Sequence, residues 1–182
     1  MSSLTIYKET GEQVSHTENA QEITLQLKAV GIEFNRWQAK YAIGDSMSNE
    51  EILNAYQDDI NEFVRCGGYQ TVDVVSMNPH HPDKKALREK FLSEHRHSED
   101  EIRFFVRGQG LFTLHINAKV YAVLCCKDDL ISVPAGTPHW FDMGEHPQFT
   151  AIRFFNNPEG WIAKYTDSPI AQNFPLLEPI IS

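Results

Sequence analysis

The sequence predicts an antiparallel β-barrel with helices packed against its outside, a mainly β fold of the α+β type. The first observation is a series of short segments after residue 100, rich in β-branched and aromatic residues and separated by turn residues at near-regular intervals. The second is the helical spacing of apolar residues before residue 93. The third is size, because 182 residues, 41% of them hydrophobic, suit one domain with a full core.

Three helices are expected in the first half of the chain, over residues 19–31, 48–67 and 82–92. The second helix has the strongest signals, because Ser48 and Glu51 form a capping box and a pair of glycines follows its last turn. Apolar residues at helical spacing form one stripe along each of the first two segments. Together these features predict amphipathic helices that pack on a sheet.

The strands are expected between and after these helices. The segments 32–39 and 69–77 look extended, and six further strands are expected at 101–106, 111–116, 120–125, 130–133, 139–143 and 149–155. Gly108 and Gly110 are expected to interrupt the chain between the first two of these. We expect residues 1–182 to form one domain, with a helix-rich N-terminal part at about 1–92 and a barrel core at about 69–156.

Charge and cysteine content narrow the class of protein. The net charge of −9 disfavours nucleic acid and anionic membranes as partners, because both would be repelled. No apolar run is long enough for a membrane helix, and the first residues carry no apolar signal segment. Three cysteines, two of them adjacent at 125 and 126, are a poor disulfide framework. We therefore expect a cytoplasmic protein. We also expect a monomer, because nothing in the sequence requires a partner chain.

A candidate metal site begins with His95 and His97. On a strand, residues two apart share a face, so both imidazoles can reach one ion; on a helix they cannot. The same alternation would carry Glu99 and Glu101 to that side, so parity alone does not choose between them. Glu101 opens an apolar segment, where a buried carboxylate needs a cation to balance its charge. We therefore expect Glu101 to be the ligand.

A third histidine, His139, follows a turn that contains Pro134, Gly136 and Pro138. It lies far enough along the chain for two hairpins to return it to the same end of a barrel. Three imidazoles and one carboxylate leave two positions open on an octahedral ion. A structural zinc site would use cysteines, so this set predicts a catalytic site suited to iron, nickel, cobalt or manganese.

These residues resemble the two sequence motifs of the cupin superfamily. His95, His97, Glu101 and Gly108 fit the pattern H-x-H-x3-E-x6-G, and Pro134, Gly136 and His139 fit P-x-G-x2-H. Cupins are small β-barrels that hold a metal ion inside, so the resemblance implies a double-stranded β-helix, or jelly roll.

The chain departs from both cupin motifs at one end. Glu89 stands where the first motif opens with glycine, and Met143 stands where the second ends in asparagine. Both departures concern turn geometry and the mouth of the barrel and leave the four candidate ligands in place.

A closer resemblance is to the bacterial acireductone dioxygenase family. It covers almost the whole chain and rests on residues 86–91, 95–106, 129–134, 137–144 and 149–161. The resemblance implies one Fe²⁺ or Ni²⁺ per chain on His95, His97, Glu101 and His139. It also implies that Arg103 contacts the substrate.

The family resemblance further implies a reaction. The substrate would be 1,2-dihydroxy-3-keto-5-methylthiopentene, an enediol of the methionine salvage pathway, oxidised by O₂. With Fe²⁺ the products would be formate and 4-methylthio-2-oxobutanoate. With Ni²⁺ they would be 3-methylthiopropionate, formate and CO.

Several candidates stay open at the level of sequence. Arg153 could orient the substrate or form a structural ion pair. Aromatic residues could line the substrate pocket or belong to the core; they are Phe91, Phe104, Phe105, Trp140, Phe141 and Trp161. Two other functions remain, a different metal-dependent cupin enzyme such as a sugar-phosphate isomerase, and a non-enzymatic cupin that binds a small molecule.

Overall fold

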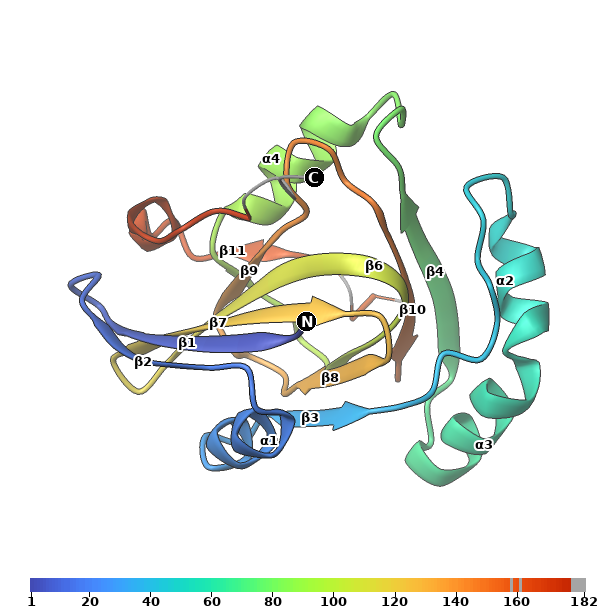
Figure 1. Ribbon diagram of the computed structural model, residues 1–182, viewed down its shortest axis with the longest axis horizontal. Helices are drawn as coiled ribbons and strands as arrows, with labels where there is room; N and C mark the ends of the chain where they lie inside the picture. The colour runs from blue at the N-terminus through green and yellow to red at the C-terminus, as the bar shows by residue number, and fades with distance from the viewer. Residues whose placement is uncertain (158, 161, 178–182) are drawn as a thin grey trace.

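Strand β6 (Glu101–Ile116) runs through the middle of the fold in the computed structural model, which describes residues 1–157, 159–160 and 162–177 (Figure 1). Its first half pairs with β8 (Asp129–Val133) and β10 (Phe149–Phe155). Its second half pairs with β7 (Lys119–Cys126) and β9 (His139–Asp142). One strand therefore belongs to two facing parts of the barrel.

The remaining strands extend the sheet from these neighbours. Strands β1 and β2 continue from β7, β3 pairs with β8, β4 pairs with β10, and β5 and β11 continue from β9. Their bounds are β1 (Ser3–Lys8), β2 (Gln13–Thr17), β3 (Glu33–Arg36), β4 (Thr71–Met77), β5 (His95–Arg96) and β11 (Lys164–Tyr165). Every one of these pairings is antiparallel, so the predicted antiparallel barrel is confirmed.

Gly108 bends β6 between its two halves. Its φ of +68° lies in the left-handed region that favours glycine, and a Cβ at this position would lie 1.7 Å from the Gln148 carbonyl oxygen. The backbone approaches β10 closely here, and the β6–β10 register shifts next to this point. Because Gly108 is near the middle of β6, the two ends of the strand turn toward the same end of the barrel.

Four helices among the described residues cover the barrel (Figure 1). Helix α1 (Ala20–Lys28) packs on β3, α2 (Asn49–Ala55) packs on β4 with α3 (Gln57–Gly67) continuing from it, and α4 (Lys84–Leu92) packs on β9. A short 3₁₀ helix (Ile170–Asn173) follows β11. No helix in the described part of the chain has both the length and the apolar character that crossing a bilayer requires.

The core has two main parts, one on each side of β6. The inward-facing residues fill the barrel and include Phe105, Phe112, Val123, Phe141 and Phe149. The outward-facing residues, which include Ile102, Phe104 and Phe154, pack against Ile52 of α2 and Tyr56 at its end. This split follows the alternation of side chains along β6, where residues 102 and 104 face one way and residue 105 faces the other.

The structure differs from the sequence-based expectations in three places. The helix expected over 48–67 is divided in two at Tyr56, whose φ and ψ of −102° and 14° leave the helical region while its ring enters the core. The break expected at Gly108–Gly110 is a bend within one continuous strand. Strands β1 and β2 were not expected, because both are short and no residue of β2 is buried.

The bend at Gly108 can be tested by substitution. Gly108→Ala combines an unfavourable φ with a backbone clash, so we expect it to lower the free energy of unfolding by about 2–5 kcal/mol. Gly31 has a φ of +83° and open space, so Gly31→Ala should cost only about 1–2 kcal/mol. Gly44 has neither constraint, so Gly44→Ala should change stability by less than about 0.5 kcal/mol. Urea unfolding measures all three; equal losses at Gly108 and Gly31 would contradict the close approach.

Candidate metal centre

Three strands bring the four candidate ligands to one end of the barrel. His95 lies in β5, and its register partner in β9 is His139. His139 also pairs with Leu114 near the end of β6, and Glu101 is the first residue of that strand. The turn before His139 is tied to the other histidine segment, because the Gly136 amide donates a hydrogen bond to the His97 carbonyl oxygen at 2.9 Å. Backbone pairing therefore fixes the relative positions of these side chains.

The three histidines form a compact, buried cluster. Ligand-capable atoms of His95, His97 and His139 all lie within 4.8 Å of one another. The Glu101 carboxylate reaches the same point, with Oε2 3.4 Å from His97 Nε2 and 3.3 Å from His139 Nε2. All four residues are at most 7% exposed. The structure thus brings together every residue that the sequence analysis selected as a metal ligand.

The backbone sets the tautomer of each imidazole. The Nδ1 atoms of His95, His97 and His139 face carbonyl oxygens of Ser93, Ile162 and Thr137 at 2.7, 3.3 and 2.8 Å. A carbonyl oxygen can only accept, so each Nδ1 carries the proton. The lone pair is then on Nε2 in all three rings, which is the form that binds a metal ion.

Burial keeps two of the histidines, His95 and His97, in their neutral, metal-binding form. It lowers the pKa of His95 to about 4, helped by the neighbouring imidazole of His139. Burial also lowers the pKa of His97, partly opposed by the carboxylate of Glu101. Both rings are therefore neutral at pH 7.

Glu101 is held as a carboxylate by a buried arginine. Burial alone would raise the pKa of Glu101, but the Arg103 guanidinium and the nearby imidazoles hold this pKa well below its usual range. Arg103 Nε and one terminal nitrogen of its guanidinium each lie 2.6 Å from Glu101 Oε1. The guanidinium is flanked by two aromatic rings, at 5.2 Å from the centre of Phe112 and 4.9 Å from that of Phe141.

Two ligand-type atoms of this cluster are left without hydrogen bonds. Among the described residues, Glu101 Oε2 and His139 Nε2 are buried polar atoms with no hydrogen-bond partner. Buried polar atoms normally have a partner, so these two indicate a ligand between them. Three imidazole nitrogens and a carboxylate oxygen are a donor set that suits a divalent transition metal. The cluster is therefore a buried three-histidine metal site.

The acidic residues between His97 and Glu101 lie outside this cluster. Asp100 is exposed, and its carboxylate accepts a hydrogen bond from the Ala135 amide at 2.8 Å, which shapes the turn before His139. Glu99 is half-buried and packs against Gly160. Of the two glutamates that parity allowed, the structure places Glu101 beside the histidines.

The aromatic candidates separate into inner and outer residues. Phe141 lies against Arg103, and Phe91 and Phe105 contact it at ring distances of 6.4 and 6.5 Å. Phe104 faces outward and packs against Tyr56, so of its two expected roles the structure favours the core one. The reason is strand alternation, which turns Phe104 away from Arg103.

The other two aromatic candidates do not extend the inner group. Trp140 packs against Phe174 in a small hydrophobic cluster on the outside of the barrel, so its role is structural. Trp161 lies outside the described residues.

Arg153 forms the ion pair that was one of its two expected roles. It donates from Nε and from a terminal nitrogen to both carboxylate oxygens of Asp73, at 2.8 and 2.6 Å. It also lies directly across from Arg103 in the β6–β10 register. This pairing joins β4 to β10.

Sequence reasoning missed a polar cluster beside His95. The imidazole of His115 lies between two carboxylates, 2.9 Å from Glu94 and 2.6 Å from Glu9. Glu94 also accepts a hydrogen bond from the Thr166 hydroxyl at 2.6 Å. These partners are distant in sequence, so no local motif could have shown that they fix the residue before His95.

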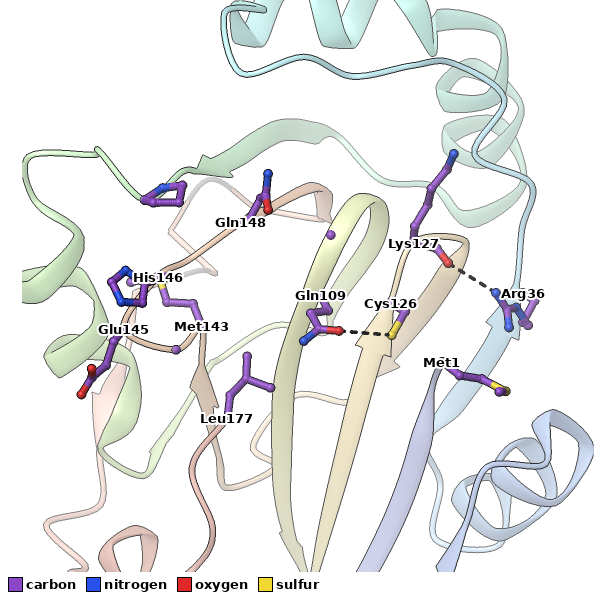
Figure 2. A pocket seen from close by; sticks show the side chains of 13 residues that line it. Met1, Arg36, Gln109, Cys126, Lys127, Met143, Glu145, His146, Gln148 and Leu177 are labelled. Carbon is purple, nitrogen blue, oxygen red and sulfur yellow. Dashed lines mark hydrogen bonds between the residues drawn. The ribbon is translucent and has the colours of Figure 1, made fainter. Parts of the chain in front are cut away.

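A separate cavity of 660 Å³ lies at the opposite end of the barrel, around the bend of β6 (Figure 2). Gln109 and Cys126 stand near its middle, Met143 and Leu177 on one side and Arg36 on the other (Figure 2). None of the four candidate metal ligands lines it. The metal site therefore lies outside this cavity.

Comparisons with known proteins agree with this geometry. A family model described as the ARD/ARD' family matches residues 3–163. An acireductone dioxygenase of Alcanivorax borkumensis is 64% identical over 148 residues, which are 81% of this chain and 82% of that protein. One from Cronobacter sakazakii is 58% identical over 97% of this chain and 99% of that protein.

A solved structure supports the same relationship. The acireductone dioxygenase of Bacillus anthracis, described with a cadmium ion in its active centre, has a TM-score of 0.77 and 28% sequence identity. The alignment covers 91% of this chain and 98% of that one. With a matching family model and relatives of this similarity over nearly its full length, the chain belongs to the ARD/ARD' family of acireductone dioxygenases.

Proposed function

We propose that this chain oxidises 1,2-dihydroxy-3-keto-5-methylthiopentene with O₂ in methionine salvage, using one Fe²⁺ or Ni²⁺ held by His95, His97, Glu101 and His139. The observation that carries the proposal is the buried carboxylate oxygen of Glu101, which faces two imidazole nitrogens and has no hydrogen-bond partner among the described residues. Membership in the ARD/ARD' family favours this reaction over an isomerase or a binding protein of the same fold.

The ligand set determines the charge of the loaded site. One carboxylate and three neutral imidazoles carry a charge of −1, so a divalent ion leaves the site with a net positive charge. When bound, the ion supplies Lewis-acid stabilisation of an anionic enediol and lowers the pKa of its hydroxyls. The carbonyl groups of Ser93, Thr137 and Ile162 keep the imidazoles oriented throughout.

Arg103 and its aromatic neighbours complete the proposed site. The Arg103 guanidinium is 5% exposed and adds positive charge close to Glu101, where an anionic substrate would bind. Phe112 and Phe141 flank this guanidinium and exclude water from it, which strengthens its electrostatic effect. Phe91 and Phe105 contact Phe141 and are the aromatic residues best placed to meet the methylthio end of the substrate.

The whole chain is proposed to work as one monomeric domain in the cytoplasm. Strands from both the first and the last parts of the described chain join one connected sheet. The three cysteines are present as free thiols, which suits a reducing compartment. The four ligands all come from one chain.

Metal removal and reloading test the reaction. Protein stripped by a chelator should consume no O₂ with a synthetic acireductone, and activity should return at about one ion per chain. We expect formate and the keto acid after Fe²⁺ loading, and CO after Ni²⁺ loading. Product analysis by mass spectrometry and CO detection provides the measurement. Oxygen uptake that persists unchanged without metal would contradict the proposal.

Removing one ligand should remove metal binding. His97→Ala takes away one of four donors, so we expect metal affinity to fall more than about 100-fold. This loss is larger than the one typical of residues that only hydrogen-bond to a metal ligand. An ion at 1,000 times its Kd stabilises the folded protein by about 4 kcal/mol, and this gain should vanish in the variant. Melting curves with and without Ni²⁺ measure it.

The matched control for this substitution is His16→Ala. His16 is exposed and hydrogen-bonded only to Thr5 among the contacts described, so the control should keep the full metal-induced shift. If His97→Ala also keeps that shift, His97 is not a ligand.

A further inference from the structure

We infer that Arg103 is a positioning residue for the metal centre, which holds Glu101 by one oxygen so that only the other can bind the ion. This inference rests on the proposed function, in which Glu101 is a ligand. It assigns Arg103 a task that is complete before any substrate arrives.

The two oxygens of Glu101 have different surroundings. Oε1 accepts hydrogen bonds from two nitrogens of Arg103, both at 2.6 Å. Oε2 faces His97 and His139 at 3.4 and 3.3 Å and has no hydrogen-bond partner among the described residues. One oxygen is therefore already engaged and the other is directed at the metal-binding nitrogens.

Arg103 is itself held in place by aromatic rings. The guanidinium lies between Phe112 and Phe141, and the Phe112 ring also stacks on His139 at 5.2 Å with an interplanar angle of 22°. Arg103 is two residues from Glu101 on the same face of β6. A planar guanidinium in this setting grips a carboxylate in a fixed direction, which a flexible ammonium cannot do.

The hydrogen bonds from Arg103 to Oε1 set how many coordination positions of the ion the protein would occupy. With three imidazole nitrogens and one carboxylate oxygen, the protein would fill four of the six positions of an octahedral ion. A carboxylate free to use both oxygens would fill a fifth. An enediol that binds through two oxygens needs two open positions, so Arg103 preserves the space that the substrate requires.

The test counts water molecules on the ion without substrate. Mn²⁺ binds oxygen and nitrogen ligands octahedrally, and the relaxation rate of water protons reports how many exchanging waters it carries. In Arg103→Met the carboxylate is released and takes a second position. The inner-sphere relaxation of the Mn²⁺-loaded variant should then be about two-fold lower than in the wild type, for one water in place of two.

Two further variants make the result specific. Arg103→Lys keeps the charge but lacks the two-nitrogen grip, so its relaxation should lie between those of the wild type and Arg103→Met. Arg107→Met removes another ion-paired arginine from β6, whose partner is Asp45, and should match the wild type. If Arg103→Met fails to fold, a reduced value for Arg103→Lys still supports the inference, and a wild-type value overturns it.

The outcomes separate this inference from the proposed function. If Arg103→Met binds Mn²⁺ with wild-type relaxation and loses only turnover, Arg103 acts directly on the substrate and the positioning role is overturned. If the wild-type protein binds no Mn²⁺, Fe²⁺ or Ni²⁺, the proposed function fails and the inference fails with it.

Discussion

The double pairing of β6 is the constraint on which the rest of the structure depends. Its first half is hydrogen-bonded in one part of the sheet and its second half in another, with Gly108 at the bend between them. Glu101 begins the first half, and His139 pairs with Leu114 near the end of the second. Because the bend is close to the middle, these two ends meet. A carboxylate and an imidazole from facing strands therefore come within bonding distance of one ion without any contribution from flexible loops.

Charge balance explains why such a site can be buried. An isolated carboxylate inside a barrel would be costly, and Arg103 offsets that cost with two short hydrogen bonds to one oxygen. His95 and His97 add no charge, since burial lowers the pKa of both imidazoles and keeps them neutral. The folded protein thus carries one balanced ion pair at this point, and a divalent ion adds the positive charge that an anionic substrate needs.

The sequence predicted the candidate site better than it predicted the path of the chain. Strand alternation predicted a shared face for His95 and His97, but the chain turns between His97 and Glu101, and Glu101 joins the histidines from a second strand, β6. The same rule, applied to Phe104, would have excluded it from the site. The predictions that failed concern features that depend on contacts between distant segments of the chain. Gly108 was expected to end a strand, and only the close approach of β10 explains why it bends one instead. The pairing of His115 with Glu9 and Glu94 likewise joins distant segments.

The hydrogen bonds of the imidazoles determine how the site meets its ion. His95 and His139 each donate to the carbonyl two residues earlier, so their orientation is fixed as soon as the local strand forms. His97 depends on Ile162, from a segment far along the chain. The backbone thus orients the imidazoles toward one point, and Arg103 holds Glu101 there by one of its oxygens. In the positioning role that we infer, Arg103 governs the only one of the four proposed ligands that can bind an ion through either one atom or two.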